Sequence, residues 1–210
     1  DVLGNSIIPV ILSTGMSAWE DIVDSVEFLE NYHSNIGILK CTSNYPASPG
    51  SIHLRGIGKL KENFPQHVVG FSDHSEGDEI CLTAVGLGVS LLEKHFTLDK
   101  NSWGPDHQAS MLPDEFKNFV QSIRKAEQAL GDKDWDIQKE EISQKATMRK
   151  GVYARRHIAQ GEPVCLLDVK FLRPPGSITP KEFFLNYKNK IATTDIQAET
   201  ELLPEYITSK

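Results

Sequence analysis

The sequence lacks the features that mark several large classes of protein. Its three cysteines, Cys41, Cys81 and Cys165, have the spacing of neither a metal site nor a disulfide framework. Cys41 and Cys81 lie in apolar runs, so we expect buried thiols, which suit a reducing compartment. The first residues show no basic stretch followed by an apolar run, as a secretory signal would. These absences predict a cytoplasmic protein.

The sequence also has little positive charge and no long hydrophobic run. Its 22 basic and 29 acidic residues give a net charge of -7. This balance argues against nucleic acid as a partner, because phosphate contacts need clustered lysine and arginine. The apolar runs are too short to cross a bilayer, so we expect no membrane partner either. A locally basic pocket can still bind a small anionic substrate.

What the sequence does contain is an alternation of apolar stretches and amphipathic stretches. We expect strands over residues 7–15, 36–42, 67–73 and 89–96, and helices over 17–32, 51–64, 77–88 and 113–131. Ser17 and Glu20 have the spacing of a capping box at the start of the first helix. Apolar strands that alternate with helices are typical of a parallel sheet with both faces covered.

The number of these units bears on the fold class. Four strand–helix units of about 30 residues amount to half of a closed (β/α)8 barrel, which needs about 250 residues. We therefore predict an α/β fold in which residues 1–131 form the carboxyl-terminal half of a TIM barrel, with the upstream half outside this sequence. An open, doubly wound sheet that is complete as it stands is the alternative. Residues 132–150 are charged and weakly patterned, and we expect a linker with some helix.

Residues 151–210 show a different pattern, which predicts a small β-rich domain. Two stretches share an alanine, an isoleucine four residues later, a polar turn and an apolar pair. These stretches align Ala154 and Ile158 with Ala192 and Ile196. The expected core is small for independent stability, so we expect this domain to dock on a larger partner.

Two histidines stand at the ends of neighbouring predicted strands. His74 follows the third strand and His95 ends the fourth. Ligands of parallel α/β proteins gather at the carboxyl ends of the strands, and adjacent strands lie about 4.8 Å apart, so both rings can reach one metal ion. Two unrelated surface histidines are the alternative. Because side chains alternate along a strand, Glu93 should face the same side as His95 while Lys94 points away.

Other polar residues are expected at the same edge of the sheet. Ser13 and Ser43 precede turns, and Ser72 should face the same side as the third-strand histidine. Asp73 and Asp106 add carboxylates. Hydroxyls beside helix starts and free backbone amides suit a phosphate or carboxylate ligand. Turn and capping chemistry is the alternative explanation for such residues.

Five motifs in order resemble the carboxyl half of the barrel of sialic acid synthases, that is, N-acetylneuraminate synthase and its bacterial relatives. They are "PVILSTGMS", "KCTSNYPAS", "GFSDHSEG", "LLEKHFTLDK" and "GPDHQASMLPDEF". "RPPGSITP", after "HIAQGEPV", resembles the antifreeze-like SAF domain of the same enzymes. The resemblance covers nearly the whole sequence. The first barrel strands, which in the family carry lysines and a glutamate for the substrates, have no counterpart here.

The resemblance implies a transferase that condenses phosphoenolpyruvate with an N-acetylated amino sugar, such as N-acetylmannosamine, and releases phosphate. It also implies a divalent metal, most often Mn²⁺ with Mg²⁺ as the second choice, and a domain-swapped homodimer. By resemblance, His74 and His95 match the metal ligands, Ser13, Ser43 and Ser72 match contacts to phosphoenolpyruvate, Tyr45 and Asp106 match positions near the sugar, and Arg173 matches an arginine that reaches the partner's site.

The resemblance also assigns chemistry and leaves alternatives. Asp106 is expected to orient a sugar hydroxyl or to move a proton, and the two histidines to act through the metal. Many family members have asparagine where this sequence has Ser43. The competing hypotheses are another metal-dependent sugar aldolase or isomerase, and a non-catalytic carbohydrate-binding fragment.

Overall fold

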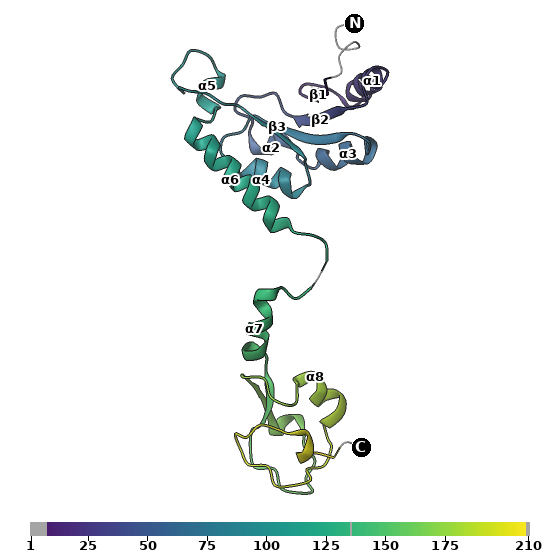
Figure 1. Ribbon diagram of the computed structural model, residues 1–210, viewed down its shortest axis with the longest axis vertical. Coiled ribbons are helices and arrows are strands. Elements are labelled where there is room, and N and C mark those ends of the chain that lie inside the picture. Colours follow the sequence, from purple (N-terminus) through teal and green to yellow (C-terminus); the bar gives the residue numbers. More distant parts are fainter. Residues whose placement is uncertain (1–7, 135, 209–210) are drawn as a thin grey trace. The chain divides into compact units, whose positions relative to one another are not determined.

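The computed structural model describes residues 8–134 and 136–208 (Figure 1). The chain divides into two compact units, Asp1–Asp132 and Lys133–Lys210. The first unit contains the strand–helix alternation and the second contains the smaller β-rich part. Each unit has its own hydrophobic cluster.

The first unit is built on a parallel sheet. Within its described residues the strands are β1 (Val10–Ser13), β2 (Ile36–Cys41), β3 (Val68–Asp73) and β4 (Leu91–Lys94). They pair in parallel in the order β1-β2-β3-β4. The order never reverses, as it must in a doubly wound sheet. The sheet therefore has the topology of a half-barrel, as the sequence predicts, and not that of the open alternative.

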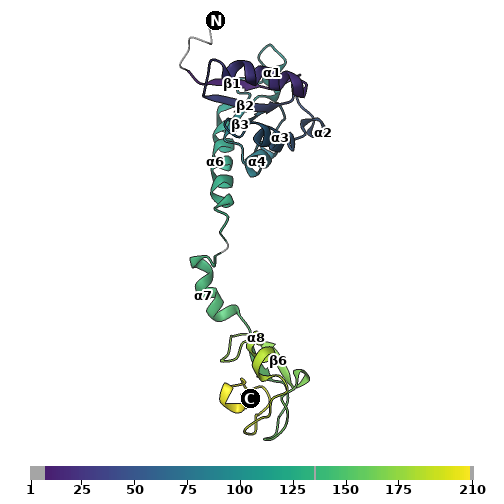
Figure 2. The same cartoon turned by 90° about the vertical axis from the view of Figure 1, so that its right-hand side faces the viewer.

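Helices return the chain between the strands. They are α1 (Trp19–Glu30), α2 (Pro49–Ile52), α3 (Gly56–Asn63), α4 (Glu79–Gly86), α5 (Asp106–Ala109) and α6 (Pro113–Leu130). Both views place α6 beside α4 (Figures 1 and 2). Since each strand is followed by a returning helix, the carboxyl ends of all these strands lie at one edge of the sheet.

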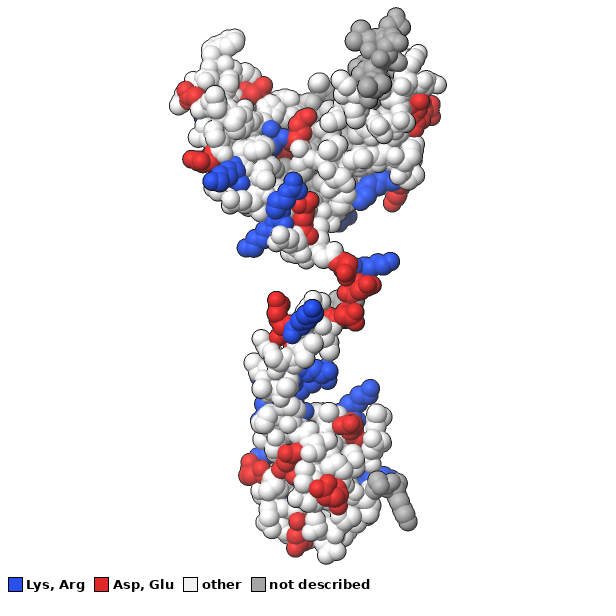
Figure 3. All heavy atoms as spheres, viewed as in Figure 1, with Lys and Arg blue, Asp and Glu red and all other residues white. Residues whose placement is uncertain are grey.

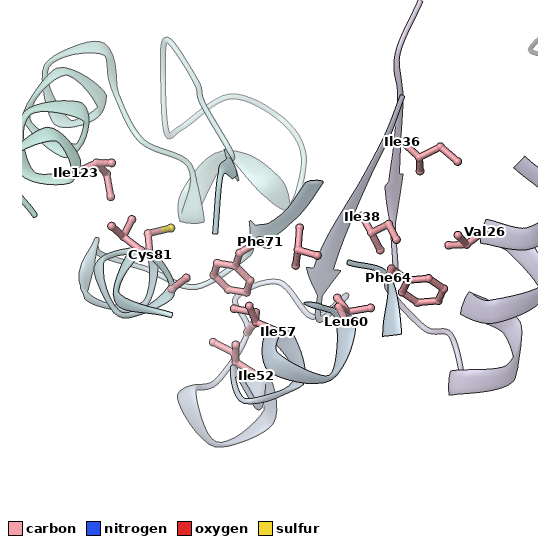
Figure 4. Packing of buried hydrophobic residues seen from close by; sticks show 14 of the residues in the cluster. Val26, Ile36, Ile38, Ile52, Ile57, Leu60, Phe64, Phe71, Cys81 and Ile123 are labelled. Atoms are coloured by element: carbon pink, nitrogen blue, oxygen red, sulfur yellow. The ribbon is translucent and has the colours of Figure 1, made fainter. Parts of the chain in front are cut away.

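The hydrophobic core lies between the helices and one face of the sheet. Phe71 of β3 points toward Ile57 of α3, near Cys81 of α4 (Figure 4). Buried residues of α1, α3, α4 and α6 join the same cluster. The opposite face is more open, because Ile11 and Val68 are 57% and 46% exposed. A hollow of about 360 Å³ on that face is lined in part by Ile11, Val68 and Leu91. Within the described residues only the helix side of the sheet is covered, and cover of the other face stays a prediction.

Two predicted helix boundaries are wrong. The helix expected over 51–64 is split, because His53 adopts a left-handed φ of 50° between α2 and α3. The first helix begins one residue later than a Ser17 cap implies, because Ala18 is the N-cap residue. There the backbone N–H of Ala18 donates to the Asp21 carboxylate at 2.8 Å. Sequence patterns find a helix more securely than its end, since neighbouring polar residues can each serve as a cap.

The predicted strands over 7–15 and 89–96 are longer than β1 and β4. Residue 7 of the first lies outside the described residues. The remaining ends lie outside the two strands, and Phe96 among them forms an isolated bridge with Met111.

The second unit starts with a helix and continues into a small β structure. It contains α7 (Lys139–Met148), β5 (Gly151–Ala154), η2 (Leu166–Asp168), β6 (Val169–Leu172), α8 (Pro180–Glu182), η3 (Phe183–Tyr187) and η4 (Pro204–Tyr206). β5 and β6 pair antiparallel. The stretch predicted as a linker thus includes α7, which has no buried residue.

The repeated alanine–isoleucine pattern forms the centre of this second unit. Ala154, Ile158, Ala192 and Ile196 are all buried in one cluster. The backbones of Ile158 and Ile196 exchange two hydrogen bonds of 2.9 and 2.8 Å. The two similar stretches therefore pack against each other through their matching residues.

Within the described residues, no helix combines the length and apolar character that a membrane crossing requires. On the face of the first unit that Figure 3 shows, acidic and basic side chains are interspersed.

Candidate functional site

Two imidazoles meet at the carboxyl edge of the parallel sheet. β3 ends at Asp73 and β4 at Lys94, so His74 and His95 are the next residue of each strand. Their ring centroids are 4.9 Å apart, and the ring planes are inclined by 81°. The structure thus brings together the two predicted ligands, while metal binding itself stays a prediction.

Hydrogen bonds with the main chain hold the two histidines in place. The Nδ1 atom of His74 is 2.9 Å from the Thr42 carbonyl oxygen, which can only accept. Nδ1 therefore carries the proton, and Nε2 is left as the nitrogen with a free lone pair. The His74 carbonyl accepts from the Ala47 N–H, and the His95 carbonyl accepts from the Met111 N–H, both at 2.9 Å.

Tyr45 covers both rings. Its ring centroid is 4.2 Å from that of His74 and 5.3 Å from that of His95. Partial burial raises the pKa of Tyr45, and the nearby Cys41, Asp106 and Glu93 add to the rise. The phenol is therefore neutral at physiological pH and can donate a hydrogen bond to a ligand. The family resemblance predicts a place for Tyr45 near the sugar, which stays a prediction, and the structure places its ring beside the histidines.

The predicted serines lie along the same edge. Ser72 is 2% exposed, and its hydroxyl donates to the Glu93 carboxylate at 2.6 Å. Ser43 lies close to the β1 turn, since a Cβ at Gly15 would be 2.1 Å from the Ser43 Oγ. Ser13 ends β1 and is exposed. The hydroxyls of Ser13 and Ser43 are thereby available to an oxyanion, while the Ser72 hydroxyl is already bonded to Glu93.

Two residues at this edge are absent from the predicted set of site residues. Glu93 faces the histidine side, as strand alternation predicts, and its bond to Ser72 makes it part of the site. The Cys41 Sγ is 3.8 Å from the Nδ1 of His74 and 3.9 Å from the Ser43 Oγ. Alternation along β2 was the signal that could have found Cys41.

Asp73 does not lie where the sequence analysis grouped it. It alternates with Ser72 and points to the helix side of the sheet, where Lys94 Nζ lies 2.7 Å from its Oδ2. Cys81 of α4 donates its thiol hydrogen to the same oxygen at 3.2 Å. Lys94 points away from the histidine side, as predicted, but into this buried contact.

The remaining candidates are Asp106 and Arg173. Asp106 is the exposed first residue of α5, and its carbonyl accepts from the Ser110 hydroxyl at 2.6 Å. The neighbouring His107 holds this loop through a 2.7 Å contact between its Nδ1 and the Thr97 Oγ1. Arg173 belongs to the second unit, where it is exposed and precedes Pro174.

The donor set suits an open metal site. Across residues 8–134 and 136–208, no cluster of three or more His, Cys, Asp or Glu side chains could hold an ion. A closed structural site, which needs four protein ligands, does not fit these residues. The pair of imidazoles 4.9 Å apart supplies two of the three protein ligands usual in a catalytic centre, and so fits an open site that needs further ligands from elsewhere.

Comparison with known proteins identifies the family. Residues 2–135 match the family model described as the NeuB family. The chain belongs to the NeuB family. This finding agrees with the resemblance to sialic acid synthases that the sequence motifs carry.

Named relatives place this NeuB-family chain among sugar-acid synthases. It is 38% identical over 205 residues to N,N'-diacetyllegionaminic acid synthase of Legionella pneumophila, covering 95% of this chain and 57% of that protein. It is 31% identical over 201 residues to the human N-acetylneuraminate-9-phosphate synthase, covering 95% of this chain and 55% of that protein. The chain thus spans little more than half the length of these relatives.

A solved structure supports the same placement. The N-acetylneuraminic acid synthetase of Leptospira borgpetersenii, in complex with citrate, superposes with a TM-score of 0.61 at 32% sequence identity. The match covers 67% of this chain and 49% of that one.

Proposed function

We propose that the protein carrying this chain condenses phosphoenolpyruvate with an N-acylated amino sugar, N-acetylmannosamine or a close relative, to give a sialic acid-type nonulosonate and phosphate. The observation that carries the proposal is the pair of imidazoles 4.9 Å apart at the carboxyl edge of a NeuB-family sheet. The relatives, which are named as synthases of N,N'-diacetyllegionaminic acid and of N-acetylneuraminate 9-phosphate, support it.

The chemistry assigns a role to each group at the edge. C3 of phosphoenolpyruvate bonds to the aldehyde carbon of the sugar, water adds at C2, and phosphate leaves. A divalent ion held by His74 and His95, Mn²⁺ or Mg²⁺, would supply a Lewis acid for the aldehyde oxygen. Ser13 and Ser43 bind the phosphate or carboxylate of phosphoenolpyruvate through their hydroxyls, and Ser72 lies beside them with its hydroxyl bonded to Glu93.

The sugar side of the site uses other residues. The neutral phenol of Tyr45 donates to a sugar oxygen, and Asp106 orients a hydroxyl or moves a proton. We further propose that Arg173 of a second copy completes the pocket in a domain-swapped homodimer and holds the acyl group of the sugar. In this proposal residues 151–210 form a SAF domain.

We also propose that additional strands cover the open face of the sheet and complete a barrel. The exposed side chains of Ile11 and Val68 support this, because such apolar residues are normally buried. In the family, the added strands carry the lysines and the glutamate that contact the substrates.

The direct test is phosphate release by the complete protein from phosphoenolpyruvate and N-acetylmannosamine, with and without Mn²⁺. Loss of a Lewis acid removes several kcal/mol of transition-state stabilisation, so His74→Ala and His95→Ala should each lower turnover at least about 100-fold. His53→Asn is the matched control, since His53 is exposed and asparagine tolerates its left-handed backbone. This control should keep wild-type activity.

Other outcomes separate the alternatives. A sugar product formed without phosphoenolpyruvate would indicate an aldolase or isomerase. Sugar binding without any turnover would indicate a non-catalytic module. Full activity of both alanine variants after metal removal would contradict the proposed role of the histidines.

A further inference from the structure

A buried ion pair lies on the far side of the sheet from the two histidines. Lys94 Nζ is 2.7 Å from Asp73 Oδ2, and the two side chains are only 1% and 0% exposed. Asp73 and Lys94 are register partners at the carboxyl ends of β3 and β4, so each directly precedes one histidine. Burying two charges costs much desolvation and adds little to stability compared with apolar packing. The location of the pair therefore points to a role beyond stability.

Lys94 also holds the residue on the other side of His74. Its ammonium group donates to the Ser75 main-chain carbonyl. The Oδ1 atom of Asp73 accepts from the Ser75 N–H at 2.9 Å and from the Ser75 hydroxyl at 2.7 Å. Lys94 thus fixes both chain neighbours of His74, while its own next residue is His95.

A second cross-strand contact braces the same strand ends on the opposite face. Ser72 and Glu93 are the preceding register partners, and their side chains are joined by the 2.6 Å hydrogen bond. Polar side-chain pairs on both faces of the sheet therefore hold β3 against β4 at the residues that precede the two histidines. A shift of either strand end would change the distance and angle between the rings.

We propose that the Lys94–Asp73 pair positions His74 and His95 for a shared divalent ion. This inference rests on the proposed function, because it takes the two rings to be metal ligands. Lys94 and Asp73 are positioning residues, which act on the ion only through the histidines. Removing the pair should therefore weaken metal binding and alter the ligand geometry even in a folded protein.

The experiment measures binding of Mn²⁺ and Co²⁺ to the complete protein without substrates. The double variant Asp73→Asn/Lys94→Met removes both charges at once, so neither is left buried and unpaired. The Kd for Mn²⁺ is obtained from the spin-resonance signal of the free ion, and the visible spectrum of bound Co²⁺ reports ligand geometry. Loss of a residue that orients metal ligands typically weakens binding about 10- to 100-fold, which is the expected change.

Two control variants separate positioning from general stability. Arg124→Met/Glu127→Gln removes an exposed ion pair of α6, and Ile123→Ala destabilises the core of the same helix. Both should bind Mn²⁺ with wild-type affinity and give the wild-type Co²⁺ spectrum, whatever their melting temperature. Ser75→Ala, which removes one hydrogen bond to Asp73, should show a smaller loss of affinity in the same direction as the double variant.

Each possible result of these measurements bears on the inference or on the proposed function. A folded double variant with wild-type Mn²⁺ affinity and Co²⁺ spectrum overturns the inference. If the double variant does not fold, Ser75→Ala decides, and unchanged affinity and spectrum in that variant overturn it. Wild-type protein that binds Mn²⁺ no better than His74→Ala refutes the metal site itself, and so overturns the proposed function together with the inference.

Discussion

The substitution Gly15→Ala tests the predicted role of Ser43 without altering Ser43 itself. The backbone of Gly15 lies outside the left-handed region, so alanine adds no backbone strain. Its Cβ, however, would lie 2.1 Å from the Ser43 Oγ and 3.3 Å from the Cys41 Sγ. Because the Ser43 hydroxyl ends a short side chain, it can rotate away at a cost of about 1 kcal/mol. The protein should therefore fold, with Ser43 turned out of the site.

The expected effect is on phosphoenolpyruvate binding. A hydrogen bond to a charged group contributes about 1.5–3 kcal/mol, so losing it should raise KM for phosphoenolpyruvate about 10-fold or more. Ser43→Ala should have the same effect, and the double variant should be no worse than either single change. Gly58→Ala is the control, because a Cβ at Gly58 of α3 meets nothing within 4 Å.

Steady-state kinetics on the complete protein decide the matter, with KM for each substrate measured separately. The reasoning is refuted if Gly15→Ala and Ser43→Ala have additive effects, since the first is expected to act only through the second. It is equally refuted if Ser43→Ala leaves KM for phosphoenolpyruvate unchanged.

Two further predictions concern the second unit and the titration of the site. Ile158→Ala should lower the free energy of unfolding of the second unit by about 2–5 kcal/mol, because Ile158 is fully buried in the cluster that contains Ile196. The control Leu167→Ala, at an 82% exposed position, should change this free energy by less than about 0.5 kcal/mol. The raised pKa of Tyr45 should place its ionisation above the usual value of 10.0, seen as an absorbance change at high pH that is missing in Tyr45→Phe. Since the neutral phenol is favoured in the folded state, this contribution to stability is complete below pH 10 and is lost as the pH rises through the folded pKa. Ionisation of Tyr45 at or below its usual pKa would contradict the burial argument, and equal destabilisation by the two alanine substitutions would contradict the packing.

Much of the first unit follows from the periodicity of its apolar residues. Val69 and Phe71 alternate with Gly70 and Ser72, which identifies β3 and already separates the core side from the site side. The split at His53 could not be predicted, because nothing in the residue types of 51–64 excludes a continuous helix.

The site shows the same division between local pattern and tertiary contact. Alternation along β4 correctly separates Glu93 from Lys94, but it does not say what covers each face. Lys94 is buried because α4 and the Asp73 carboxylate lie over it, and that depends on register and packing. The proposed contribution of Arg173 depends on a proposed assembly, which the local pattern does not contain.

The central claim is that one divalent ion lies between two imidazoles at the sheet edge. Its most direct test is anomalous diffraction at the manganese edge from crystals of the complete protein soaked in Mn²⁺. We predict a single strong peak within coordination distance of the Nε2 atoms of both His74 and His95, absent from crystals of either alanine variant. A peak elsewhere, or rings whose Nε2 atoms face away from each other with no ion between them, would contradict the account.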